Sequence, residues 1–232
     1  MLKEIRKELR NLANPEKAKI LMGFFKTGKG QYGEGDKFLG ITVPQTRLVA
    51  KKHAQLPLAE VLQLLQSAFH EERLAALLIL VLQYQQGDEK QKKKIFDAYL
   101  KNTQWINNWD LVDLTADRIV GAYLANKPKD LLFKLAKSKM LWERRIAMLA
   151  TFHEIKIGRS EIALAIAEKL LLDQEDLMHK AVGWMLREVG KRCSQQAEEK
   201  FLQKYAKLMS RTTLRYAIER FEEGKRLRYL KM

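Results

Sequence analysis

Four short segments repeat along the chain: Arg73-Leu-Ala75, Arg145-Ile-Ala147, Lys180-Ala-Val182 and Arg215-Tyr-Ala217. Each segment opens the apolar part of a predicted helix, the second of a pair. Their first residues are separated by 72, 35 and 35 positions, which fit one period of about 36 residues with one step missing. Helix pairs that recur at this period are typical of α-solenoids of the HEAT or armadillo kind. The repeats therefore predict an all-α solenoid.

The apolar residues around these repeats follow the 3.6-residue period of a helix and rarely break it. A first helix should begin at Asn14-Pro15, where Asn caps and Pro occupies the first turn, and run to about residue 26. Further helices are expected over residues 44–54, 57–67, 70–86, 88–101, 107–125, 128–138, 140–157, 159–172, 174–192, 194–209 and 211–228. No segment alternates well enough to predict a strand. We expect one HEAT-like domain over residues 1–232 with a basic concave groove.

The composition is strongly basic. The 232 residues include 43 Lys and Arg against 28 Asp and Glu, a net charge of +15, and 47% of the residues are apolar. Such a charge favours a polyanionic partner, although a basic protein without one remains the alternative. The single cysteine, Cys193, excludes an intramolecular disulfide and suits a reducing compartment. The charged N-terminal helix pattern and the lack of a long apolar stretch predict a cytoplasmic protein without membrane spans.

One segment, residues 28–35, is rich in glycine. Gly28, Gly30 and Gly33 formally match a dinucleotide-binding pattern, but that pattern requires a strand before it and a helix after it. Here a helix precedes the glycines, and Lys37-Phe-Leu-Gly-Ile-Thr42 follows, so we reject a nucleotide site. Two interpretations remain open: a plain linker, or a flexible loop whose cations contact a phosphate backbone, namely Lys26, Lys29 and Lys37.

The period of about 36 residues places one further repeat between Arg73 and Arg145, and its first position is Trp109. This residue lies within Trp105-Ile-Asn-Asn-Trp-Asp-Leu-Val-Asp113. Trp109 and Asp113 are four residues apart, so a helix would place them on one face, one turn apart. Other repeats carry Arg or Lys at the Trp109 position, whereas a core Trp would replace Leu, Ile or Ala. We therefore interpret the pair as the chemical centre. The alternatives are a core role for Trp109, and a capped first turn for Asp110 and Asp113.

The same register predicts two rows of equivalent positions. The first row is Arg73, Trp109, Arg145, Lys180 and Arg215, and the second, four residues later, is Leu77, Asp113, Leu149, Trp184 and Glu219. We expect Trp109, Asp113, Arg145 and Trp184 to converge in the basic groove. Arg145 has two simpler interpretations, as a solvated surface residue or as the ion-pair partner of Asp113.

Other chemistry is not indicated. The four histidines have no metal-ligand spacing to one another, and one cysteine cannot build a zinc site. The chain has no nucleophile elbow, phosphate loop or paired-acid motif. We expect no metal and no cofactor.

Four motifs carry a family resemblance: Phe38-Leu-Gly-Ile-Thr-Val-Pro44 with Arg47, Asn108-Trp-Asp-Leu-Val-Asp113, Leu141-Trp-Glu-Arg-Arg-Ile-Ala147 and Lys180-Ala-Val-Gly-Trp-Met-Leu-Arg-Glu188. Together they resemble the bacterial DNA alkylation repair glycosylases built on HEAT-like repeats, the AlkD family, over nearly the whole chain. The resemblance implies excision of N3- or N7-alkylated purines from duplex DNA during base excision repair, without a base-flipping pocket. It also implies that Asp113 is the catalytic carboxylate and that Trp109 and Trp184 face the sugar.

The resemblance further implies a phosphate contact by Arg145. We expect additional DNA contacts from Lys180, Arg187, Arg73, Arg47 and Lys29, and a monomeric protein. The glycine-rich segment departs from the best-known members, which are shorter there. Two other functions remain: a non-catalytic HEAT-repeat protein that binds damaged or branched DNA, and a scaffold for protein partners.

Overall fold

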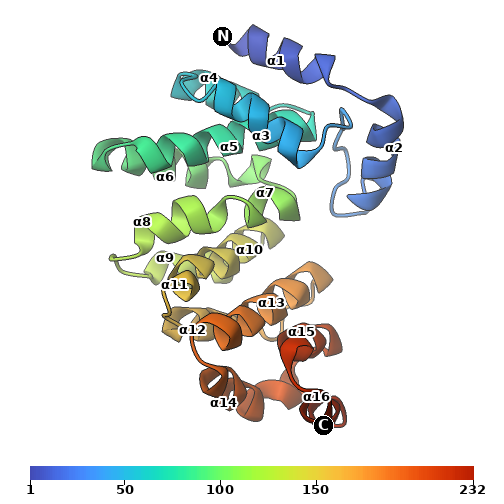
Figure 1. Cartoon of the computed structure of the whole chain (residues 1–232), viewed down its shortest axis with the longest axis vertical. Coiled ribbons are helices and arrows are strands. Elements are labelled where there is room, and N and C mark those ends of the chain that lie inside the picture. Colours follow the sequence, from blue (N-terminus) through green and yellow to red (C-terminus); the bar gives the residue numbers. More distant parts are fainter. The chain divides into compact units, whose positions relative to one another are not determined.

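The computed structural model describes residues 1–232 and is helical throughout (Figure 1). Its one β feature is an isolated bridge between Lys37 and Phe69. The chain forms two compact units, Met1–Thr115 and Ala116–Met232. Within each unit most helices pack against others that lie a few elements away in the chain, as in an α-solenoid. The all-α prediction is confirmed, while a single domain over residues 1–232 stays a prediction.

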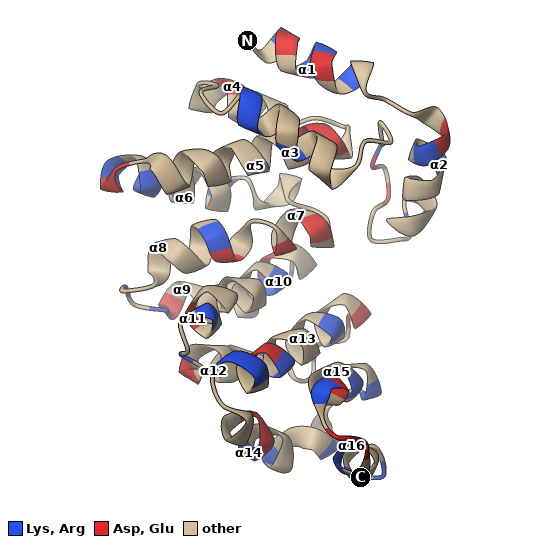
Figure 2. Cartoon of the chain, in the orientation of Figure 1, with Lys and Arg blue, Asp and Glu red and all other residues tan.

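The first unit is organised around one long buried helix, α5. Its elements are α1 (Leu2–Asn11), α2 (Pro15–Phe24), α3 (Val43–Lys52), α4 (Leu58–Leu65), α5 (His70–Gln86), α6 (Glu89–Lys101), the 3-10 turn η1 (Thr103–Trp105) and α7 (Trp109–Asp113). α5 packs against α3, α4, α6 and α7, and every residue from 70 to 81 is buried. After Arg73 the helix carries no charge, so Figure 2 shows it almost wholly uncoloured. A helix that is apolar on all sides belongs in a core.

The second unit is organised in the same way around α13. Its elements are the π-helical turn η2 (Asp117–Gly121), α8 (Ala122–Leu124), α9 (Asp130–Ala136), α10 (Leu141–Ala150), α11 (Phe152–Lys156), α12 (Glu161–Leu170), α13 (Asp176–Arg192), α14 (Gln195–Tyr205), η3 (Ala206–Leu208), α15 (Arg211–Ala217), η4 (Ile218–Arg220) and α16 (Glu223–Leu230). α13 packs against α10, α12, α14 and α15. Gly183 permits a close approach of α13 to α15, because a Cβ there would lie 2.5 Å from the Thr213 carbonyl oxygen.

Several helix starts are fixed by capping side chains. Asn14 Oδ1 accepts a hydrogen bond from Lys17 N at 3.0 Å at the start of α2, and Thr42 forms a capping box with Gln45 at the start of α3. Asp88 caps α6 by accepting from Gln91 N at 2.7 Å. These caps satisfy backbone donors that a helix terminus otherwise leaves unpaired.

Several expected helices are shorter than predicted or divided, and the break within 107–125 matters most. The segment expected as one helix over 107–125 contains α7, a turn, the π-helical η2 and α8. At the turn, Thr115 Oγ1 donates to the Leu111 carbonyl oxygen, a local bond that competes with the helical pattern. The segments 140–157 and 211–228 are likewise divided, at Thr151 and at residues 221–222. The boundary between the two units falls in the first break.

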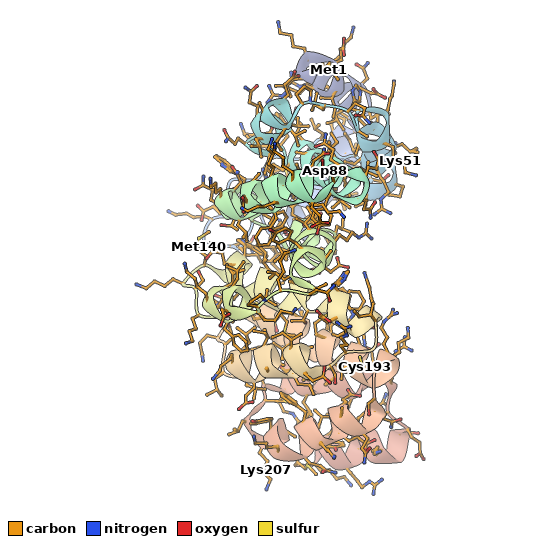
Figure 3. The ribbon with its side chains drawn as sticks, turned by 90° about the vertical axis from the view of Figure 1, so that its left-hand side faces the viewer. Met1, Lys51, Asp88, Met140, Cys193 and Lys207 are labelled. Atoms are coloured by element: carbon orange, nitrogen blue, oxygen red, sulfur yellow. The ribbon has the colours of Figure 1, made fainter.

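Much of the positive charge lies on side chains that extend into solvent. Lys51 and Lys207, labelled in Figure 3, are both exposed. None of the helices combines the length and the apolar character needed to cross a bilayer.

Candidate functional site

Trp109 and Asp113 occupy the open face of α7. The helix begins after Asn108, whose buried side-chain oxygen accepts from Trp109 N at 2.8 Å. The three middle residues of α7 are buried, whereas Trp109 and Asp113 are half-buried. The four-residue spacing therefore places an indole ring and a carboxylate side by side on the accessible surface of one helix.

Aromatic rings from α2 and the segment after it support Trp109 from behind. The Phe25 ring stacks on Trp109 with centroids 5.2 Å apart and an interplanar angle of 18°, and Phe24 meets Trp109 edge-on at 5.8 Å. Phe25 also stacks on Phe38 at 5.1 Å. Trp109 thus packs against a cluster of buried residues that includes Ala18, Phe25 and Phe38, while part of its surface stays exposed. The alternative interpretation of Trp109 as a core residue therefore describes only the side of the ring that Phe25 covers.

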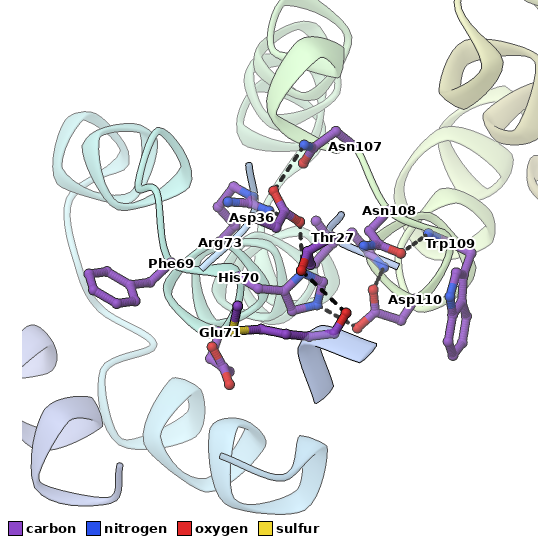
Figure 4. Close-up of polar contacts among 12 residues, drawn as sticks. Thr27, Asp36, Phe69, His70, Glu71, Arg73, Asn107, Asn108, Trp109 and Asp110 are labelled. Carbon is purple, nitrogen blue, oxygen red and sulfur yellow. Dashed lines mark hydrogen bonds and ion pairs between the residues drawn. The ribbon is translucent and has the colours of Figure 1, made fainter. Parts of the chain in front are cut away.

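The rings of Phe24, Phe25 and Phe38 form an aromatic wall behind Trp109. A buried polar network lies beside this wall (Figure 4). His70, the first residue of α5, places Nε2 2.8 Å from Asp110 Oδ2 and Nδ1 3.5 Å from Asp36 Oδ2. Arg73 Nη2 donates to the same Asp36 oxygen at 2.7 Å, and Asn107 Nδ2 donates to Asp36 Oδ1 at 3.3 Å. The network joins the end of the glycine-rich segment, the start of α5 and the first turn of α7.

The network shifts the pKa values of Asp36 and His70. Burial alone would raise the pKa of Asp36, but hydrogen bonding with His70 and the charge of Arg73 outweigh burial and lower it. Burial alone would lower the pKa of His70, but Coulomb attraction to Asp110 and hydrogen bonds to Asp110 and Asp36 raise it to about 8. His70 is therefore a cation at neutral pH, buried between two carboxylates.

The position of Arg73 corrects one sequence expectation. Its side chain is buried, with only 2% of the residue exposed, and its guanidinium donates to Asp36 and to the Ser67 carbonyl oxygen at 2.9 Å. The charge of Arg73 is balanced by the buried Asp36 carboxylate, so its guanidinium has a structural role in the network. We assign Arg73 to the network and leave it out of the proposed DNA contacts.

The glycine-rich segment 28–35 is a folded turn. Gly30 N donates to Glu34 Oε2 at 2.7 Å, and Gly33 N donates to the Lys26 carbonyl oxygen at 3.1 Å. A Cβ at Gly33 would lie 2.4 Å from the Phe25 carbonyl oxygen, so this close turn requires glycine. No strand precedes the segment and no helix opens directly after it, in agreement with rejecting a nucleotide site. Lys29 is exposed at its tip.

The second unit carries the other candidate residues. Trp184 is half-buried on α13, with its ring 5.9 Å from Phe152. Arg145 on α10 is 4% exposed and donates to the Leu177 carbonyl oxygen. Lys180 forms an ion pair with Asp176 at 2.7 Å, four residues earlier on α13.

Two further candidates differ in their surroundings. Arg187 of α13 pairs with Glu219 of η4, and Arg47 is half-buried on α3. The predicted rows are not uniformly open, because Leu77 and Leu149 are buried whereas Arg215 and Glu219 are exposed. A row of equivalent sequence positions therefore mixes core and surface residues.

Sequence reasoning missed the roles of His70, Asp36 and Phe25. His70 was considered only as a metal ligand, and no three His, Cys, Asp or Glu side chains are arranged to hold a metal ion. A usable signal was the charged run Glu71-Glu72-Arg73 at the start of an otherwise apolar helix. Buried charges require partners, and those partners had to come from elsewhere in the chain.

Comparison with known proteins identifies the family. The family model described as DNA alkylation repair enzyme matches residues 5–221. A solved structure described as a predicted DNA alkylation repair enzyme from Enterococcus faecalis superposes with a TM-score of 0.68 at 17% sequence identity. The match covers 91% of this chain and 97% of that one, which establishes a shared fold. No curated protein matches the sequence significantly. Because the family model spans nearly all of its length, the chain belongs to the DNA alkylation repair enzyme family.

Proposed function

We propose that this protein is a DNA glycosylase that excises N3- or N7-alkylated purines from duplex DNA as the first step of base excision repair. The observation that carries the proposal is the pairing of Trp109 and Asp113 on the open face of α7, in a chain whose family is named for DNA alkylation repair. The net charge of +15 suits a DNA partner. We further propose that it acts as a monomer, in the cytoplasm.

The proposed reaction requires a carboxylate but no general acid. A purine alkylated at N3 or N7 already carries positive charge, so the base leaves without further protonation. The barrier lies in the positive charge that develops on the deoxyribose as the N-glycosidic bond breaks. In the proposed reaction Asp113 stabilises that oxocarbenium ion and orients the water that attacks C1′, which selectively favours the transition state.

The aromatic and cationic residues have complementary roles in the proposal. The exposed part of Trp109 packs on the sugar and attracts its cationic C–H groups, as in cation–π contacts, while Phe25 supports the other side of the ring. From the repeat register and the family resemblance, we assign the same role to Trp184. The proposed phosphate contacts come from Arg145, Lys180, Arg187, Arg47 and Lys29.

The proposal is tested by base release. Excess protein is mixed with a duplex that contains one N7-methylguanine, and the free base and the abasic site are quantified over time. Release of both in equal amounts, at a rate well above spontaneous depurination, supports a glycosylase. Tight duplex binding without release would refute it and favour the alternative, a non-catalytic protein that binds damaged or branched DNA.

A further inference from the structure

His70 is the junction of three segments that are distant in the sequence. It is 2% exposed, and its two ring nitrogens face Asp110 of α7 and Asp36, the residue that follows the glycine-rich segment. Its backbone N donates to the Lys37 carbonyl oxygen at 2.8 Å, beside the bridge between Lys37 and Phe69. Both carboxylates are themselves buried and lie within 3.5 Å of the ring nitrogens.

Charged groups and aromatic rings both lie next to the imidazole, and Figure 4 shows the charged ones. The charged groups near it are Asp110 from α7, Asp36 from the preceding loop and Arg73 from its own helix. The Phe38 ring stacks on the imidazole at 4.6 Å, and the Phe25 ring lies tilted against it at 4.9 Å. The same Phe25 stacks on Trp109. His70 therefore contacts two groups next to the candidate site: the Asp110 carboxylate in α7, and the Phe25 ring that stacks on Trp109.

α7 depends on this junction for its position. The helix has only five residues, which is too short to be stable by itself, so tertiary contacts must hold it. Asp110 lies in its first turn and divides its carboxylate between two partners: Oδ1 accepts from Leu111 N at 2.8 Å, and Oδ2 faces His70 Nε2. Trp109 and Asp113 lie on either side of Asp110 in the same short helix.

We propose that His70 is a positioning residue of the reaction, which clamps the first turn of α7 to α5 and to the end of the glycine-rich segment and thereby sets the place of Trp109 and Asp113. This inference rests on the proposed function. His70 does not touch the reacting atoms and acts through α7. The clamp consists of one imidazolium between two carboxylates, so it needs the protonated ring.

The charge requirement gives the clamp a pH dependence. The pKa of His70 is raised to about 8, above its ordinary value of 6.5, so the clamp is complete at lower pH. As pH rises through about 8, the ring loses its proton and the attraction to Asp36 and Asp110. The expected consequence is a looser α7 and slower excision at alkaline pH.

The test compares His70→Gln with a matched control, His53→Gln. Gln keeps a neutral hydrogen-bond donor but cannot titrate in this range. His53 is a partly buried histidine of the first unit that likewise pairs with a carboxylate, Glu8 of α1, at 2.9 Å. Single-turnover excision of N7-methylguanine and binding to a duplex with a tetrahydrofuran abasic analogue are measured from pH 6 to pH 9.5. The titration of the lesion itself cancels in the ratio of wild-type to variant rates.

The clamp predicts a specific pattern. At pH 6.5 His70→Gln should excise about tenfold more slowly than the wild type, a loss of about 1.4 kcal/mol of transition-state stabilisation, with binding within twofold. The ratio should fall toward one above pH 9. The control should stay within twofold throughout. A ratio that is constant with pH, or an equal loss in His53→Gln, would overturn the proposal. If His70→Gln does not fold, Asp110→Asn carries the same test.

A second readout is independent of excision. The indole N–H resonance of Trp109, assigned with Trp109→Phe, should titrate with an apparent pKa of about 8 in the wild type and not in His70→Gln. If the wild type releases no base, the proposed function fails, and this titration still decides whether the clamp exists. Absence of the titration in the wild type contradicts the clamp.

Discussion

Glu71 should be one of the most sensitive positions of the first unit. Its side chain is 2% exposed and accepts three backbone hydrogen bonds: from Leu39 N at 2.8 Å, from Gly40 N at 2.8 Å and from Ile41 N at 3.2 Å. These amides belong to the segment that carries Phe38, which stacks on His70 and Phe25. Glu71 therefore fixes the aromatic wall behind Trp109 through the backbone.

The expected loss of stability on substituting Glu71 follows from these three hydrogen bonds. Hydrogen bonds to a charged acceptor contribute about 1.5–3 kcal/mol each, and buried donors left without an acceptor cost about 1–3 kcal/mol each. The three share one carboxylate, so their effects do not add fully, and Glu71→Ala should lower the free energy of unfolding by about 4 kcal/mol. Glu71→Gln keeps one oxygen and should lose about 2 kcal/mol.

Urea unfolding followed by tryptophan fluorescence measures both losses, because Trp105 and Trp109 lie in the first unit. Excision by the folded fraction of Glu71→Ala should also slow, since Phe38 and Phe25 lose their fixed position. A loss below about 1 kcal/mol for Glu71→Ala would refute the reasoning, because water or another donor–acceptor pair would then have replaced the carboxylate.

Three other substitutions have defined outcomes. Phe25→Ala removes the ring stacked on Trp109 and should cost about 4 kcal/mol in thermal unfolding, and wild-type stability would contradict the packing. Gly121→Ala places a Cβ 2.2 Å from the Ala150 carbonyl oxygen and should cost about 3 kcal/mol in urea unfolding, whereas a neutral effect would mean that η2 can shift. Burial raises the pKa of Glu198 to about 8, so the folded protein loses stability as pH rises from 4.5 to 8. Glu198→Gln should be more stable than wild type by on the order of 2 kcal/mol at pH 8 and equal to it at pH 4.5, and an equal difference at both pH values would contradict this origin.

The helices were predictable where local signals and burial agree. The expected helix over 70–86 has the bounds of α5, because the apolar stretch Leu74–Leu82 lies within it and Gly87 follows its last residue. The prediction of one continuous helix over 107–125 was wrong, because the apolar residues keep the helical period across the turn that follows α7. The break depends on the Thr115 hydroxyl, which bonds to Leu111 and Tyr99, and the Tyr99 contact is a tertiary one.

The candidate site was predictable only within α7. The spacing of Trp109 and Asp113 places both on one face, which any helix would do. Asp36, His70 and Asp110 meet across separations that sequence periodicity does not encode, since Asp110 follows its partner His70 by 40 positions. For the same reason the sequence does not reveal the pairing of Arg73 with Asp36, which lies 37 residues earlier.

The central claim is that the Asp113 carboxylate promotes the breaking of the N-glycosidic bond. Its most direct test is single-turnover release of N7-methylguanine by wild type and Asp113→Asn, with binding to the abasic-analogue duplex measured for both. Asn retains the size of the side chain and removes its charge. Asp113→Asn should release the base about 100-fold or more slowly than the wild type, with binding within a few-fold. Equal release by the two proteins would contradict it and move the chemistry away from α7.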